Sequence, residues 1–146
     1  MRPLRCYAPL FLLCAVTANS QQQNFDQVEI HTEPVQHNIY MLVGAGGNTT
    51  VQVGSEGVLM VDTQFAPLAP KLMAEIRKLS PGPLRYIINT HVHPDHVGGN
   101  AAIAKLAGSD PALPLKIIAQ ENVKTRLAKG QYMAFFKRQV DPMDPA

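Results

Sequence analysis

Three of the five histidines in this chain lie within six positions, in the stretch NTHVHPDHVGGN at residues 89–100. Side chains alternate along extended backbone, so His91, His93 and Asp95 project to one side and His96 to the other. Two imidazoles placed two positions apart can bind one metal ion. Asp95 and His96 can turn toward a second ion nearby if the backbone curls after the cluster.

The residues around the cluster favour metal binding over a solvated histidine-rich loop. The apolar run LRYIINT precedes it, and Gly98 and Gly99 follow it. A solvated loop would need neither, whereas glycines permit the curl and the close backbone approaches that a metal loop requires. A divalent cation held by imidazole and carboxylate lowers the pKa of bound water to about 7 and polarises the bond under attack. The cluster therefore predicts metal-dependent hydrolysis.

Other kinds of catalytic centre find no support in the sequence. There is no nucleophile elbow, and the glycine stretch GAGG at residues 44–47 is too short for a phosphate loop. Cys6 and Cys14 both lie in the amino-terminal segment, so the rest of the chain has no thiolate. Any metal in that part must be bound through nitrogen and oxygen.

The amino terminus has the pattern of an export signal, which we place at residues 1–18. A short positive segment is followed by the apolar stretch APLFLLCAV and then by small residues. A transmembrane anchor would need roughly 20 apolar residues, and a lipid-modified Cys14 is disfavoured by bulky Leu13 before it. We expect an exported protein, periplasmic or secreted, with no membrane association after cleavage.

Charge and composition limit the partners. The formal net charge of +2 comes from Arg2 and Arg5, and the remaining eleven basic residues balance eleven acidic ones. This neutral body predicts no nucleic-acid partner, and we expect a small-molecule substrate instead. Hydrophobic residues make up 46% of the chain, enough to bury a core. The sequence leaves the oligomeric state open.

The pattern along the chain predicts an α/β fold. After a flexible lead-in at residues 19–27 we expect a partial domain over residues 28–146. It begins with short β-prone runs, VEIH, IYMLV, TTVQV and GVLMVD, joined by glycine-rich turns. Helices and strands then alternate, with helices in APKLMAEIRKLSPGP, in residues 101–106 with Asn100 as cap, and in ENVKTRLAKG, and strands in LRYIINT and LKIIA. Such an order predicts a sheet covered by helices. QYMAFFKR, at residues 131–138, is interpreted as a helix packed on the core, or else as a rim near the site.

The stretch THVHPDHVGGN resembles the signature of the metallo-β-lactamase-fold hydrolases, a superfamily that includes glyoxalase-II-type thioesterases. Upstream, GGNTTVQVGSEGVLMVDT resembles the early hairpin of that family, whose second strand ends in an aspartate, here Asp62. LRYIINT resembles the strand that delivers the metal loop. The resemblance covers roughly residues 28 to 128. It implies that the chain forms the amino-terminal half of an αββα sandwich.

The resemblance also implies roles for individual residues. His91 and His93 would bind the first metal ion, and Asp95 and His96 the second. Asp95 would also act in catalysis by orienting the bridging water or hydroxide. Asp62 would hydrogen-bond within the site and fix the metal loop; the alternative is an ordinary turn aspartate after a strand. The cofactor implied is zinc, two ions in the complete protein, with iron or manganese as alternatives.

The resemblance implies an exported hydrolase in which metal-bound hydroxide attacks the carbonyl of a β-lactam, thioester or lactone. Two alternatives stay open: a mononuclear iron oxygenase of the same fold acting on sulfur compounds, and an inactive metal-binding fragment. The family completes its site with downstream ligands, but no histidine follows His96, and Asp110, Asp141 and Asp144 lie in loop-like or terminal contexts. We therefore expect the chain to be half of a longer protein, aggregation-prone and weakly zinc-binding on its own.

Overall fold

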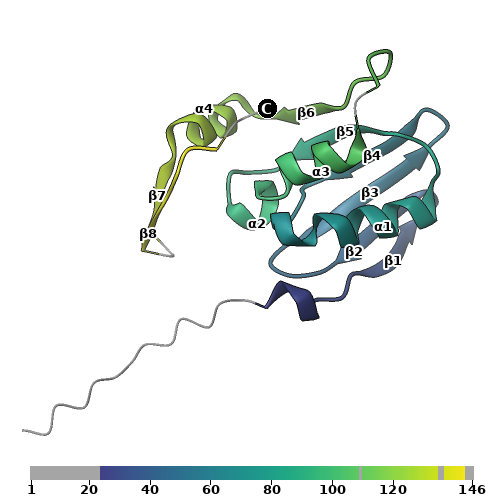
Figure 1. Ribbon diagram of the computed structural model, residues 1–146, viewed down its shortest axis with the longest axis horizontal. Coiled ribbons are helices and arrows are strands. Elements are labelled where there is room, and N and C mark those ends of the chain that lie inside the picture. The colour runs from purple at the N-terminus through teal and green to yellow at the C-terminus, as the bar shows by residue number, and fades with distance from the viewer. Residues whose placement is uncertain (1–23, 109, 135–136, 144–146) are drawn as a thin grey trace, which may run out of the picture.

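The computed structural model describes residues 24–108, 110–134 and 137–143. The expected signal peptide, residues 1–18, and most of the lead-in lie outside them. Six strands form one sheet in the order of the sequence (Figure 1): β1 (His31–Gln36), β2 (Ile39–Val43), β3 (Asn48–Gly54), β4 (Gly57–Val61), β5 (Leu84–Asn89) and β6 (Lys116–Ala119). β1 to β4 pair antiparallel as a meander, and β5 and β6 join in parallel. The expected order of a meander followed by α/β units is confirmed.

Helices α1 (Ala69–Leu79) and α3 (Asn100–Ala107) lie in connections between strands and cover one face of the sheet (Figure 1). The other helices are η1 (Phe25–Gln27), η2 (Ala66–Leu68), α2 (Pro94–Val97) and α4 (Glu121–Lys129). In α1 the buried residues Leu72, Met73 and Ile76 recur at helical spacing. The helix ends at Leu79 because Ser80 is extended before Pro81, as proline requires of the residue before it.

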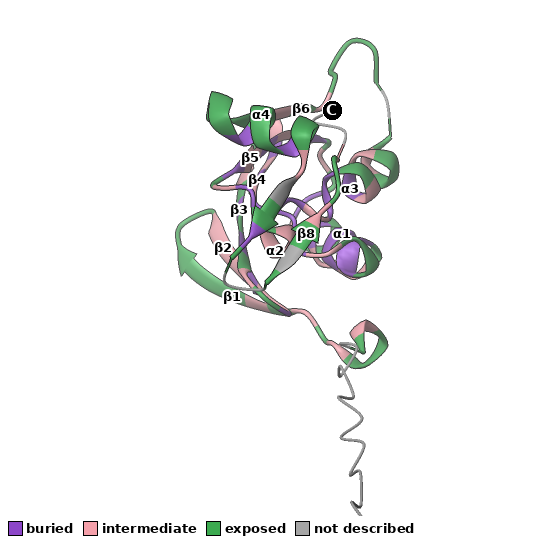
Figure 2. Ribbon diagram, turned by 90° about the vertical axis from the view of Figure 1, so that its left-hand side faces the viewer, coloured by how far each residue is buried: buried purple, intermediate pink, exposed green. Residues whose placement is uncertain are grey.

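The core lies between the sheet and the pair α1 and α3 (Figure 2). On β4, Val58 and Met60 are buried against the helices, whereas Leu59 and Val61 point to the other face and are only half-buried. That other face continues to Ile118 of β6, which is 47% exposed. A sheet with helices on one side and apolar residues on both sides is what half of a two-sheet sandwich presents.

Two expected elements differ from the structure. VEIH was expected to be the first strand, but β1 begins only at His31 and continues through Pro34. Proline is tolerated there because β1 is an edge strand, and the pairing register shifts beside it, between Pro34 and Gln36. The helix expected over residues 131–138 is wrong: the described part forms a hairpin of β7 (Gln131–Met133) and β8 (Arg138–Val140).

The last helix packs on the histidine loop. Val123 and Leu127 of α4 form a small apolar cluster with Val92 and Val97, and Met143 packs against it. This cluster places α4 beside the segment that carries the histidines.

Among the residues that the structure describes, no helix has the length and apolar character needed to cross a bilayer.

Candidate metal centre

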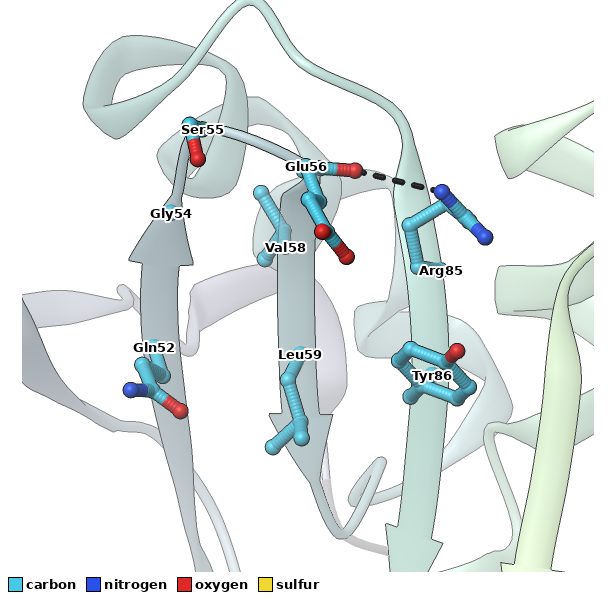
Figure 3. A pocket seen from close by; sticks show the side chains of 9 residues that line it. Gln52, Gly54, Ser55, Glu56, Val58, Leu59, Arg85 and Tyr86 are labelled. Atoms are coloured by element: carbon cyan, nitrogen blue, oxygen red, sulfur yellow. Dashed lines mark hydrogen bonds between the residues drawn. The ribbon is translucent and has the colours of Figure 1, made fainter. Parts of the chain in front are cut away.

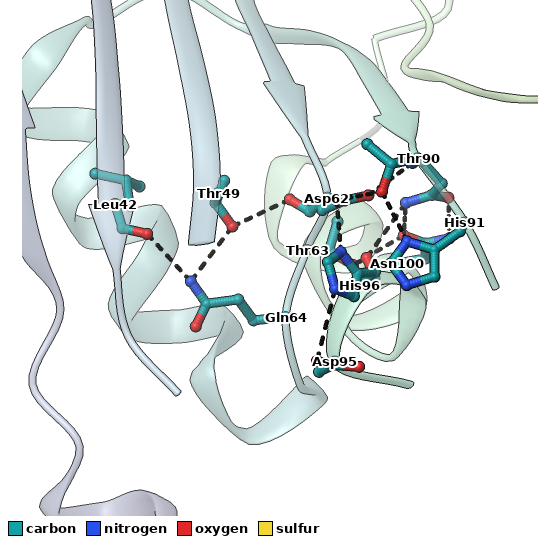
Figure 4. A network of polar contacts seen from close by, with 11 residues as sticks. Leu42, Thr49, Asp62, Thr63, Gln64, Thr90, His91, Asp95, His96 and Asn100 are labelled. Atoms are coloured by element: carbon teal, nitrogen blue, oxygen red, sulfur yellow. Dashed lines mark hydrogen bonds and ion pairs between the residues drawn. The ribbon is translucent and has the colours of Figure 1, made fainter. Parts of the chain in front are cut away.

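The histidine cluster and Asp62 lie at the same edge of the sheet. β4 and β5 are parallel neighbours, so the residues that follow them meet at their carboxyl ends. Asp62 follows β4 directly, and the histidine loop follows β5 (Figure 4). The sequence pattern predicts extended backbone through the cluster, but the chain already bends at residues 90–92, directly after β5. His93 is extended, and Pro94 then opens the short helix α2. Asp95 and His96 therefore lie on a helical turn.

The three imidazoles gather at this edge. The ring centroids of His91 and His93 are 4.6 Å apart, and those of His91 and His96 are 3.9 Å apart. Asp95 Oδ2 lies 3.6 Å from His96 Nε2. All four predicted ligands are thus neighbours. In the described ranges, however, no three or more histidine, cysteine or acidic side chains are spaced to hold one metal ion.

Asp62 holds the cluster in place through hydrogen bonds with Thr90 and His96 (Figure 4). It is 4% exposed and lies in the left-handed region with φ of 61°. Its Oδ1 accepts a hydrogen bond from the Thr90 N–H (2.8 Å), and its Oδ2 accepts from the Thr90 hydroxyl (2.7 Å). Oδ2 also lies 2.7 Å from His96 Nδ1. Since a carboxylate accepts only, we assign the proton of His96 to Nδ1, which leaves Nε2 to bind a metal ion.

Thr90 fixes the proton of His91 on Nδ1 in the same way. Its hydroxyl has one proton, which goes to Asp62, so it can only accept from His91 Nδ1, 3.0 Å away. His91 is then protonated at Nδ1 as well and presents Nε2. A hydrogen bond at one ring nitrogen leaves the other nitrogen available to bind a metal ion. Metal-binding histidines in proteins commonly have this arrangement.

The electrostatics of the cluster favour neutral imidazole at His91. Burial lowers the pKa of His91 below its ordinary value of 6.5, and the neighbouring His96 and His93 lower it further. Asp62 and Asp95 act in the opposite direction. A neutral ring is the form that binds a cation.

Three buried polar side chains that the sequence analysis did not assign to the site hold the loop. The Thr63 hydroxyl lies 3.1 Å from the His96 carbonyl oxygen and 2.9 Å from Asn100 Oδ1. Asn89 and Asn100 exchange amide hydrogen bonds of 2.8 and 3.2 Å. Asn100 is the first residue of α3 and not its cap, which is Gly99. For Thr63 and Asn89 the signal available in the sequence was a polar residue where an apolar strand ends; Asn100 offered only the signal of a helix start.

Gly98 and Gly99 are required for close approach. Their φ values of −62° and −85° are open to any residue. A Cβ on Gly98 would overlap the Pro94 carbonyl oxygen, and one on Gly99 would overlap the Thr63 carbonyl oxygen. The pair thus lets the start of α3 pack directly on the segment after β4.

A second glycine segment covers the other side of the cluster. The glycine loop (residues 44–47) joins β2 to β3. A Cβ on Gly46 would lie 2.6 Å from Asp95 Cβ, and one on Gly47 would lie 2.9 Å from His96 Cε1. The backbone of this loop therefore lies against two of the predicted ligands.

One pocket of the sheet lies away from the histidine cluster. A cavity of about 300 Å³ is formed by the β3–β4 turn and the first residues of β5, at the opposite strand ends from the histidines (Figure 3). Arg85 lines it and donates a hydrogen bond to the Glu56 carbonyl oxygen (3.4 Å). This cavity and the histidine cluster are separate features of the molecule.

Comparison with known proteins identifies the class that this fold and cluster define. Residues 34–120 match the sequence model of the Metallo-beta-lactamase superfamily, and the chain belongs to this superfamily. The fold class expected from the sequence is thereby confirmed.

Individual relatives are similar over part of their length. The subclass B3 metallo-beta-lactamase BJP-1 of Bradyrhizobium japonicum is 29% identical with a TM-score of 0.58, over 71% of this chain and 38% of that one. The class B3 di-zinc metallo-beta-lactamase LRA-12 from an Alaskan soil metagenome has a TM-score of 0.64 and 20% identity, over 84% of this chain and 47% of that one. At this identity the likeness shows the fold alone. A linear primary-alkylsulfatase of Pseudomonas sp. is 44% identical over 45 residues, 30% of this chain and 8% of that protein. The chain thus spans less than half the length of these relatives.

Proposed function

We propose that this chain supplies the first group of ligands of a metal-dependent hydrolase. The observation that supports this most directly is the gathering of three imidazoles and the Asp95 carboxylate at one strand edge, with the His96 ring oriented by Asp62. Membership of the superfamily supports the same reading. Zinc is the ion we propose, since imidazole and carboxylate are among its usual ligands and a neighbouring structure is described as di-zinc.

Each residue of the cluster then has a defined task. His91 and His93 would hold one ion, and Asp95 and His96 the other. A divalent cation supplies a water of lowered pKa and polarises the bond to be broken. Asp95 would orient the attacking water through its carboxylate. Asp62 keeps the His96 ring in the tautomer that presents Nε2, and Thr90 does the same for His91.

For the substrate we propose a small carbonyl compound of the β-lactam, thioester or lactone class. The B3 β-lactamase neighbours favour the β-lactam among these. A second candidate is a sulfate ester, favoured by the 44% identity to an alkylsulfatase over 45 residues. We also propose export to the periplasm or medium through residues 1–18, on the pattern of that segment.

A substrate panel tests the proposal. The zinc-loaded protein is assayed on one β-lactam, one thioester, one lactone and one primary alkyl sulfate. His93→Ala should abolish turnover of whichever is hydrolysed, whereas the matched variant His31→Ala, in an exposed histidine of β1, should retain it. Equal turnover in both variants would remove His93 from the mechanism.

A further inference from the structure

The side chain of Gln64 is completely buried two residues beyond Asp62. Its φ of 51° lies in the left-handed region, which non-glycine residues adopt infrequently. A buried amide needs partners, and the amide of Gln64 has three; Figure 4 shows those to Leu42 and Thr49. Oε1 accepts from the Ala45 N–H (3.1 Å), and Nε2 donates to the Leu42 carbonyl oxygen (3.3 Å) and lies 3.4 Å from Thr49 Oγ1. Gln64 thus binds the glycine loop and both strands that flank it.

The main chain of Gln64 bonds to the histidine segment, on the side opposite the glycine loop. Its carbonyl oxygen accepts from the Gly99 N–H at 2.8 Å, at the end of the turn that carries Asp95 and His96. The neighbouring Thr63 N–H donates to the His96 carbonyl oxygen at 2.8 Å. One residue therefore connects the glycine loop on one side to the histidine segment on the other.

The glycine loop in turn limits where two predicted ligands can lie. It passes so close to Asp95 and His96 that even a methyl group on Gly46 or Gly47 would enter their space. The His96 ring is held at Nδ1 by Asp62 and faces Gly47 at Cε1. A shift of the loop would move the Asp95 side chain and the free edge of the His96 ring together.

We propose that Gln64 is a positioning residue of the candidate metal centre: by hydrogen-bonding the glycine loop it sets the positions of the Asp95 carboxylate and the His96 imidazole. The inference rests on the proposed function in naming these side chains as ligands. Its geometric part concerns the metal-free chain and can be measured there. A purely structural Gln64 would stabilise the fold without controlling the ring of His96.

The first measurement is the Cε1–H NMR signal of His96 in the metal-free 146-residue chain. Gln64→Met keeps a similar volume and removes the amide, so the His96 signal should shift. Gln64→Glu keeps an oxygen for the Ala45 N–H but loses the donor to the Leu42 carbonyl oxygen, so its signal should lie between those of Gln64→Met and wild type. Leu72→Ala, in the buried face of α1, is the control for lost stability and should leave the signal in place.

Gly47→Ala provides a test that leaves Gln64 intact and serves if Gln64→Met does not fold. Its added Cβ lies against His96 Cε1, so it should also shift the His96 signal. An unchanged signal in this variant would overturn the proposal, because the loop would then not control the ring. A shift in Leu72→Ala as large as in Gln64→Met would overturn it too.

The second measurement is the visible absorption spectrum during titration with Co²⁺, used as a probe in place of zinc. Gln64→Met should weaken Co²⁺ binding about tenfold and alter the absorption bands, because residues that orient metal ligands commonly contribute a factor of this size. If the wild-type chain binds no Co²⁺, the proposed function fails, while the His96 signal still decides the role of Gln64. If wild type and Gln64→Met bind alike with the same spectrum, the positioning role is wrong.

Discussion

Asp62 determines which nitrogen of His96 is available, since its carboxylate can only accept the Nδ1 proton. The sequence analysis places Asp62 beside the site, but through resemblance alone. The structure adds the physical reason: a left-handed backbone turns the side chain toward Thr90 and His96. The metal-binding roles of the four predicted ligands stay predictions.

At this scale we expect Asp62→Asn to weaken zinc binding by about 10- to 100-fold. The amide that replaces the carboxylate no longer enforces the Nδ1–H tautomer of His96. Competition titration with a zinc-binding dye measures the change. The exposed Asp26→Asn is the control and should bind like wild type; the same affinity in both variants would show that Asp62 does not orient His96.

A second expectation concerns protonation of His91, whose pKa is lowered chiefly by burial. Its Cε1–H signal should titrate below pH 6.5 in the metal-free chain. The unfolded chain then takes up the proton first as pH falls, so His91 contributes stability above pH 6.5 that is lost as pH drops through its folded pKa. A His91 pKa at or above 6.5 would contradict this expectation.

At the scale of elements, the order of strands and helices could be predicted because apolar periodicity and glycine-proline punctuation are local signals. A curl was expected after the cluster, but its true place could not be predicted, because the turn is held by hydrogen bonds of His96 with Thr63 and Asp62, 33 and 34 positions away. For the same reason, the sequence does not predict the roles of Thr63, Gln64 and Asn89 beside the site. Their side chains look ordinary in sequence and acquire their task only where β4 and β5 end side by side.

The close approach of Gly99 to Thr63 gives a prediction at this scale. Gly99→Ala should lower the free energy of unfolding by about 1–3 kcal/mol, because the added methyl overlaps the Thr63 carbonyl and forces backbone shifts. Urea denaturation measures it. Gly54→Ala is the matched control, since the nearest atom lies 3.7 Å from its Cβ. Equal stability of the two variants would show that the packing at Gly99 is loose.

At the scale of the whole molecule, the open sheet face is the dominant feature. Leu59, Val61 and Ile88 lie half-buried on it and Ile118 lies exposed, as expected for one sheet of a sandwich. The relatives extend well beyond the part that this chain matches. Large apolar surfaces of this kind promote association.

We therefore expect the chain alone to self-associate as its concentration rises. Ile118→Lys places a charge on the open face and should shift the sedimentation profile toward monomer, without a large loss of stability. Ile87→Lys, on the helix-covered face, should instead unfold the chain, because Ile87 is fully buried. A wild-type chain that stays monomeric at all concentrations would contradict this expectation.

The most direct test of the account is a zinc titration of the chain followed by long-range ¹H–¹⁵N NMR of its histidine rings. We predict that zinc moves the Nε2 signals of His91 and His96 and the ring signals of His93, while His31 and His37 remain unchanged. If the rings of His91, His93 and His96 show no response at saturating zinc, the metal centre proposed here does not exist.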